Sequence, residues 1–320
     1  MPCIGSFYET IVHLTFYEII KIISGKKSII TQKMKKLIIN ADDLGAEEGR
    51  NSGIFEAVRA GAVKSVSLLA NAPATDEALK AIRDGKFREV SIGVHLNLSE
   101  GRPLCPDLLL LVGRDGAFQG KRSAQRLLLQ ENHPELEEEV FREVDAQIGV
   151  LLRAKISLSH LDGHQHLHVF PAVRRAAIRA AEMHGIPWIR IPHESFPVSE
   201  ANHIPEDHKS EGRLFSDLGG ETGRLLAGSG IHTTAHFRGL YLKGRLSAER
   251  LEEYLRKLPE GLTELMVHPG RVRVGAAAGP FSGFSTMDRE GELEALLSPS
   301  FEMAVRKNRV SLISFREALP

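Results

Sequence analysis

One short segment of the chain concentrates side chains that bind metals. His160, Asp162, His164, His166 and His168 place four imidazoles and a carboxylate within nine residues. In an extended chain these five side chains share one face, and a face this polar cannot pack against an apolar core. Since imidazole is the commonest metal-binding side chain near neutral pH, the segment predicts a metal-centred site.

The segment by itself cannot supply a complete metal site. An extended chain advances about 3.3 Å per residue, so the side chains at its two ends lie more than roughly 20 Å apart. One or two ligands from this segment are realistic, and the others must come from elsewhere in the chain. The alternative interpretation is a solvated, histidine-rich strand end with no bound ion.

Polar side chains also follow other predicted strands. Asp42 and Asp43 follow the first apolar run, His95 ends a later one, and His268 follows another. In parallel α/β folds the carboxyl ends of the strands hold the active site, so these groups are expected to meet. Neighbouring carboxylates repel unless a cation or proton intervenes, so one could bind a metal while the other acts as a base. Taken singly, an aspartate pair in a turn or a histidine at a strand end also has a purely structural explanation.

The pattern of apolar residues predicts the elements that must position these groups. Strand-like runs alternate with helical patterns in the 320 residues, which favours a parallel sheet covered by helices. Such a sheet can be an open nucleotide-binding sheet or a closed barrel. No glycine-rich GxGxxG turn follows the first strand, which argues against the open nucleotide-binding sheet. We interpret residues 193–231 as loops with short helices. The expected strands are 37–39, 65–70, 90–96, 158–162, 188–191, 232–237, 263–267 and 311–314, and the expected helices are 50–60, 75–83, 134–155, 172–184, 248–258, 289–297 and 301–309.

Composition narrows the class of partner. Lysine plus arginine and aspartate plus glutamate number 41 each, so nothing favours nucleic acid, which usually requires a basic excess. Cys3 and Cys105 make no disulfide framework, which fits a reducing cytoplasm. We interpret residues 1–33 as an extension outside the domain, with Met34 as a possible start of translation. Charged residues interrupt its apolar stretch, so no stable membrane insertion is expected.

Together, these motifs resemble the YdjC-like carbohydrate deacetylase family. The matching segments are 39–45, 93–96, 160–168 and 268–270, in the family's order, and the resemblance covers roughly residues 36–316. It implies a single domain over 34–320, a distorted (β/α) barrel of parallel strands, usually a homodimer. The implied reaction removes acetyl groups from N-acetylated amino sugars with one divalent metal ion. The histidine segment is similar to that of members linked to hopanoid lipid biosynthesis.

The resemblance also implies roles for particular residues. Asp43, His95 and His164 would bind the metal, Asp42 would be the base, and His268 would be a second acid–base or oxyanion-stabilising group. One carboxylate and two imidazoles suit Zn, Mn, Co or Fe(II), and the resemblance adds Mg. We expect Asp162 to orient a ligand imidazole, as carboxylates behind metal-binding histidines often do.

Amide hydrolysis agrees with this assignment. It needs an activated water, a polarised carbonyl and a protonated leaving amine, and a three-ligand metal with an adjacent base can supply the first two. We expect the segments 193–231 and 275–283 to set the choice of acetylated sugar, oligosaccharide or glycolipid. Two alternatives stay open: another metal-dependent hydrolase such as a phosphoesterase, and a non-catalytic, metal-stabilised sugar-binding protein.

Overall fold

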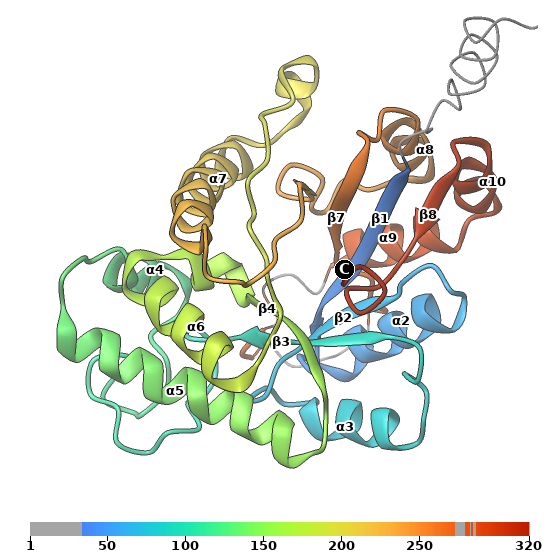
Figure 1. Ribbon diagram of the computed structural model, residues 1–320. Helices are drawn as coiled ribbons and strands as arrows, with labels where there is room; N and C mark the ends of the chain where they lie inside the picture. Colours follow the sequence, from blue (N-terminus) through green and yellow to red (C-terminus); the bar gives the residue numbers. More distant parts are fainter. Residues whose placement is uncertain (1–33, 273–278, 282, 284–285, 320) are drawn as a thin grey trace, which may run out of the picture. The chain divides into compact units, whose positions relative to one another are not determined.

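The computed structural model describes residues 34–272, 279–281, 283 and 286–319 (Figure 1). The proposed extension over residues 1–33 and part of the segment 275–283 lie outside the described residues. The strands are β1 (Lys35–Leu44), β2 (Ser65–Leu68), β3 (Ser91–Leu96), β4 (Leu158–Gly163), β5 (Trp188–Ile189), β6 (His236–Arg238), β7 (Gly261–Val267) and β8 (Val310–Leu312). All of their pairings are parallel.

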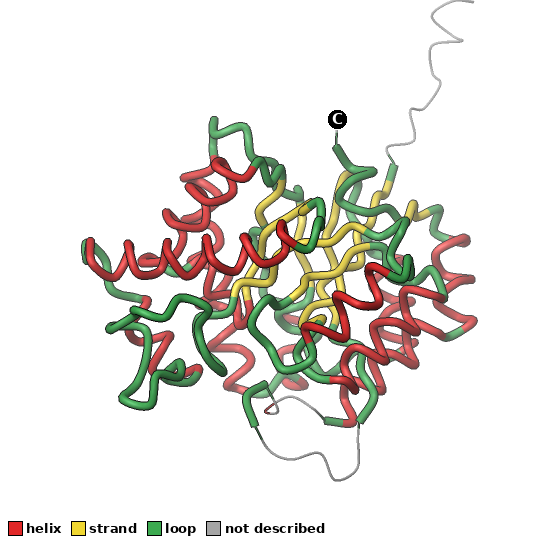
Figure 2. The backbone as a smooth tube through the Cα atoms, turned by 90° about the horizontal axis from the view of Figure 1, so that it is seen from below, coloured by secondary structure: helices red, strands yellow, loops and turns green. Residues whose placement is uncertain are grey.

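The sheet is a distorted barrel, as predicted. Its order is β5-β4-β3-β2-β1-β7-β6, and β8 pairs with the first residues of β1. The two outer strands, β5 and β6, are short, and a single bridge from Trp188 to His232 links β5 to the chain that leads into β6. Figure 2 shows the strands in the interior with helices around them. The β-α alternation therefore led to the correct fold class.

Helices cover the outside of the sheet. Those described are α2 (Glu48–Arg59), α3 (Thr75–Arg83), α4 (Lys121–Leu128), α5 (Pro134–Arg153), α6 (Pro171–His184), α7 (Glu206–Leu226), α8 (Ala248–Arg256), α9 (Met287–Leu297) and α10 (Pro299–Lys307), with 3₁₀ turns η1 (His164–Val169) and η2 (Val198–His203). Local sequence fixes some of these bounds. Helix α6 begins with Pro171 in its first turn and ends at Gly185, whose φ of 64° suits glycine.

The segment 193–231 differs from its predicted structure. It contains the 21-residue helix α7 rather than loops with short helices only. Its glycines lower its intrinsic helix propensity, but Phe215, Leu218 and Leu226 give it one buried apolar face. Tertiary packing of that face outweighs the weak local preference. Helix α4 was also absent from the predicted elements.

The histidine segment is extended only in its first part. Strand β4 ends at Gly163, and η1 then turns the chain through Gln165 and His166, whose φ angles are 55° and 56°. The strand predicted over 158–162 is therefore present, and only His160 and Asp162 of the five polar residues lie on it. The turn separates the segment into groups with different surroundings.

Candidate active site

The two adjacent aspartates reach the same cavity because the end of β1 is irregular. The pairing of β1 with β2 shifts register between Ala41 and Leu44, and Asp43 has a φ of 67°. A regular strand would direct Asp42 and Asp43 to opposite faces, whereas a bulge re-aims side chains at a strand end. Both carboxylates consequently line one cavity of about 200 Å³.

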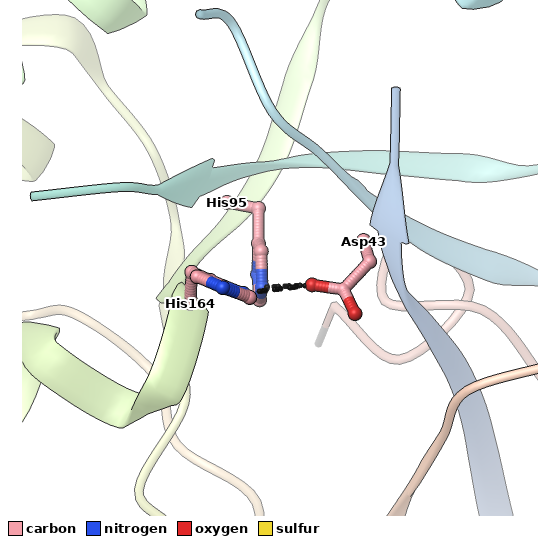
Figure 3. Close-up of side chains that lie close together, drawn as sticks. All are labelled: Asp43, His95 and His164. Carbon is pink, nitrogen blue, oxygen red and sulfur yellow. Dashed lines mark hydrogen bonds and ion pairs between the residues drawn. The ribbon is translucent and has the colours of Figure 1, made fainter. Parts of the chain in front are cut away.

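Asp43, His95 and His164 converge from three strand ends (Figure 3). Oδ1 of Asp43 lies 2.8 Å from Nδ1 of His164 and 3.4 Å from Nε2 of His95. One potential ligand atom from each residue lies within 4.8 Å of the others, and all three residues are buried. The structure thus brings together the three residues expected to bind a metal.

Asp162 lies directly behind one of these imidazoles. Strands β3 and β4 pair His95 with Asp162, and Oδ1 of Asp162 is 2.7 Å from Nδ1 of His95. Burial disfavours the imidazolium, but Asp162 and Asp43 outweigh it and raise the pKa of His95 to about 10. The carboxylates therefore stabilise a positive charge at this position, and Asp162 leaves only Nε2 facing the centre.

Two arginines hold the other oxygen of Asp43. Oδ2 lies 2.6 Å from Nη2 of Arg289 and 3.2 Å from Nη1 of Arg50. Burial disfavours the carboxylate, but His164, Arg50 and Arg289 together keep the pKa of Asp43 well below its usual value. Asp43 is thus held ionised, with Oδ1 as the oxygen presented to His95 and His164.

The contacts of Asp43 and His95 decide which of their atoms could bind a metal ion. The outward atoms of His95 and Asp43 are taken by Asp162 and the two arginines, so the inward atoms are the ones presented. One carboxylate oxygen and two imidazole nitrogens form the donor set of many divalent-metal sites with open positions. The residues present fit such an ion.

Asp42 lies in a different electrostatic setting. Arg190 donates to both of its oxygens, at 2.6 Å and 2.7 Å, and the amide of Asn40 donates to Oδ1 at 2.8 Å. Burial raises the pKa of Asp42, and Arg190 offsets this only in part. Arg190 also pairs with Asp162 and Glu264, each at 2.7 Å, so one guanidinium serves three buried carboxylates.

Arg190 bears on the number of metal ions. Asp42, His95 and Asp162 form a second group whose ligand atoms lie within 4.8 Å of one another. It shares His95 with the first group, and both of its carboxylates already pair with Arg190. The arrangement therefore favours one metal ion over the pair that a two-metal phosphoesterase needs.

His268 lines the same cavity, at the end of β7. Its backbone N–H donates to Glu292 at 2.6 Å, which fixes the chain where it leaves the strand. Burial, and then the charge of Arg289, hold the pKa of His268 well below its usual value. All six residues singled out from the sequence therefore lie at one end of the barrel: Asp42, Asp43, His95, Asp162, His164 and His268.

Two histidines of the segment are structural. His160 stacks on Phe315 with ring centroids 4.1 Å apart, and its two nitrogens lie 2.8 Å and 3.1 Å from serine hydroxyls. A Cβ on Gly93 would lie 2.4 Å from the His160 ring, so this strand position must be glycine. His168 is buried, with Nε2 3.0 Å from the carbonyl of Arg190.

Sequence reasoning missed the three arginines. Arg190 stood inside a predicted strand, where a charged residue in a buried run was the available signal. Arg50 and Arg289 lie on helices α2 and α9, and nothing in their local sequence marks them. The predicted ligands are short-range motifs, whereas the arginines that orient their carboxylates come from distant parts of the chain.

Known proteins share this chain's sequence and fold. Residues 36–307 match the family model described as YdjC-like protein. The chain is 32% identical to a carbohydrate deacetylase of Homo sapiens over 87% of this chain and 89% of that protein. It is 33% identical to a carbohydrate deacetylase of Halalkalibacterium halodurans over 74% of this chain and 86% of that protein.

A solved structure supports the fold. A crystal structure of a protein named for cellobiose-phosphate cleavage, from Enterococcus faecalis, superposes with a TM-score of 0.69 at 24% identity. The match covers 90% of this chain and 100% of that one. Fold and site define a one-domain α/β barrel with an aspartate–histidine centre at the carboxyl ends of its strands. The chain belongs to the YdjC-like family.

A helix that crosses a bilayer must be both long and apolar. Within residues 34–272, 279–281, 283 and 286–319, none has both the length and the apolar character to cross a bilayer.

Proposed function

We propose that this protein is a carbohydrate N-deacetylase that hydrolyses the acetamide of an amino sugar with the help of one divalent metal ion. The observation that carries the proposal is the pairing of Asp42 with the Asp43–His95–His164 group in one cavity. A site that only binds a metal needs no separate carboxylate beside it. The names of the similar proteins in Homo sapiens and Halalkalibacterium halodurans support the sugar substrate.

In this proposal Asp43, His95 and His164 hold the ion. When bound, it lowers the pKa of water and polarises the acetyl carbonyl. Asp42 accepts the proton from the attacking water, because its raised pKa makes it a stronger base than an exposed aspartate. The same proton then passes from Asp42 to the amine nitrogen as the C–N bond breaks, so that acetate and the free amine leave. Arg190 fixes the orientation of the Asp42 carboxylate, and each oxygen keeps lone-pair capacity for the incoming proton.

His268 takes the second polar role. Its lowered pKa keeps the imidazole uncharged near neutral pH, so it carries one N–H. A neutral N–H in a buried site can donate to the oxygen on which negative charge develops during attack. Of the two roles that the resemblance implies for His268, we therefore propose oxyanion stabilisation.

The test is acetate release from N-acetylglucosamine, its β-1,4-linked disaccharide and a glycolipid that carries N-acetylglucosamine. Each substrate is incubated with purified protein, then with protein treated with EDTA, then after addition of Zn, Mg, Mn or Co. We expect acetate release to stop with EDTA and return with one or more ions, which would also identify the metal.

Two other results would favour the alternatives. Release of phosphate from an aryl phosphate, without acetate release from any sugar, would point to a phosphoesterase. Metal-dependent sugar binding without acetate release would point to a binding protein. The homodimer, the cytoplasmic location and the ion identity stay predictions that this assay, gel filtration and cell fractionation address.

A further inference from the structure

The histidine segment contains one buried imidazole that neither the metal group nor the barrel core uses. His166 is 6% exposed and lines the cavity with Asp42 and Asp43. Among the described residues, none forms a hydrogen bond with its Nδ1. Its close neighbours are aromatic: the rings of Phe215 and Phe237 lie 5.0 Å and 6.1 Å away. A proton on Nδ1 would therefore be a buried donor without an acceptor, which costs more free energy than an unprotonated nitrogen at that position.

The backbone that places His166 in the cavity is also unfavourable. Gln165 and His166 both have left-handed φ angles, and residues other than glycine adopt such backbone conformations only at a cost in free energy. Neighbouring contacts hold the turn in place: Nε2 of Gln165 donates to Glu100 at 2.9 Å, and the His166 ring packs on Phe215. Such conformations cluster at functional sites, where a side chain must be aimed at a ligand.

The surroundings of His166 indicate which of its ring nitrogens carries the proton. Nδ1 is buried and has no hydrogen-bond partner among the described residues. A neutral imidazole carries one N–H, and a buried N–H without an acceptor is rarer than an unsatisfied acceptor. The proton therefore belongs on Nε2, and Nδ1 is the unprotonated nitrogen.

The cavity around His166 has the character of a sugar-binding pocket. Phe215, Leu240 and Met266 line it, and they provide apolar surface for the C–H face of a pyranose ring. Its volume of about 200 Å³ is below the roughly 300–1,000 Å³ of pockets that enclose drug-sized ligands. That size suits one sugar ring rather than an oligosaccharide.

We propose that His166 is a substrate-binding residue whose Nε2–H donates a hydrogen bond to a hydroxyl oxygen of the amino-sugar ring, with the ring packed against Phe215. The identity of the ligand rests on the proposed deacetylase function. Substrate recognition would thus come from α7 and η1, while Asp42 and Asp43 at the end of β1 take part in the chemistry. The cavity would hold one N-acetylated sugar residue, with any further sugar or lipid outside it.

The test compares His166→Leu, which removes the donor, with His166→Gln, whose amide nitrogen can occupy a position similar to Nε2. Both replacements meet the same left-handed backbone. His184→Gln is the matched control, because His184 lies on α6 and pairs with Asp145 outside the cavity lining. The probes are N-acetylglucosamine and its 3-, 4- and 6-deoxy analogues. Binding is titrated with metal-free protein, and acetate release is measured with metal-loaded protein.

We expect His166→Leu to weaken N-acetylglucosamine binding and lower kcat/KM about tenfold, the effect of losing one buried hydrogen bond. His166→Gln should recover much of this loss, and His184→Gln should match the wild type. One deoxy analogue should bind more weakly than N-acetylglucosamine to the wild type but equally well to His166→Leu. A purely structural role would lower binding of all four sugars alike.

Three outcomes would overturn the proposal. They are unchanged binding by folded His166→Leu, an equal penalty for every deoxy analogue in both proteins, and no sugar binding by the wild type. Binding by the wild type without acetate release would instead contradict the deacetylase function, and the titrations would still test His166. The two proposals can therefore fail separately.

Discussion

His164 and His166 are two residues apart and line the same cavity, but they have opposite surroundings. Nδ1 of His164 lies 2.8 Å from a carboxylate that two arginines hold ionised. The His166 ring neighbours the rings of Phe215 and Phe237, and its Nδ1 has no hydrogen-bond partner among the described residues. The same residue type therefore supports two different functions.

This contrast divides the cavity into two sides. The side formed by β1, β3 and β4 holds carboxylates and imidazoles whose charges and hydrogen bonds leave defined ligand atoms facing inward. On the other side, α7 and β7 contribute the apolar Phe215 and Met266 together with the polar His208 and Glu211. The first side suits an ion and a proton transfer, and the second suits the sugar that must be positioned against them. The predictions below change either a charged group or a neutral histidine, and never both together.

The largest expected effect separates the two neighbouring aspartates. Asp42→Asn should keep bound metal but lower kcat about 10²–10⁴-fold, the usual contribution of a general base. Asp43→Asn should lose the metal, because it removes the charged ligand that Arg50 and Arg289 orient. Metal content by mass spectrometry and acetate release together distinguish the variants. Full activity in Asp42→Asn would show that another group is the base.

A smaller effect is expected behind the metal group. Asp162→Asn leaves His95 without the carboxylate at Nδ1, so we expect metal affinity to fall about 10–100-fold. Competition with a chromogenic chelator measures this directly, without reference to turnover. His166→Leu is the control, since it changes the other side of the cavity and should leave metal affinity unchanged. Equal affinity in wild type and Asp162→Asn would remove Asp162 from the metal site.

The smallest expected effect concerns the neutral histidine His160 and is a change in the pH dependence of the free energy of unfolding. Burial, with a further contribution from Arg190, lowers the pKa of His160 to about 3, against about 6.5 in an unfolded chain. Between these values the unfolded chain binds the extra proton, so stability is present above pH 6.5 and is lost as pH falls. We expect the wild type to lose about 1.4 kcal/mol per pH unit more than His160→Gln between pH 6 and 4.

Urea unfolding of metal-free protein at several pH values measures this difference in slope. The comparison between wild type and variant cancels the contributions of other titrating groups, such as Glu264, whose pKa burial raises to about 7. If the free energy of unfolding had the same pH dependence in the wild type and His160→Gln, His160 would be charged in the folded protein. Its description as a neutral histidine would then be wrong.

Much of the fold followed from the sequence alone. Runs at 37–39, 65–70 and 90–96 lie in or overlap parallel strands, and strands that are covered on both faces carry few charged residues. The polar residues after those strands met at one end of the barrel because parallel strands share that edge. Helix α7 was missed because its stability comes from packing of Phe215 and Leu218 and not from local propensity.

By itself, the sequence determined which residue types would meet: Asp42, Asp43, His95 and His164 follow strands, and strand ends are local features. Only the tertiary structure decided what each of them faces. The contact between Arg289 and Asp43 joins residues 246 apart in the chain, and Arg190 reaches Asp42 across 148. The turn at Gln165 and His166 likewise depends on Glu100 and Phe215. Such partners are fixed by chain packing, which carries no short-range sequence signal, so the orientation and charge of the site became visible only in the folded chain.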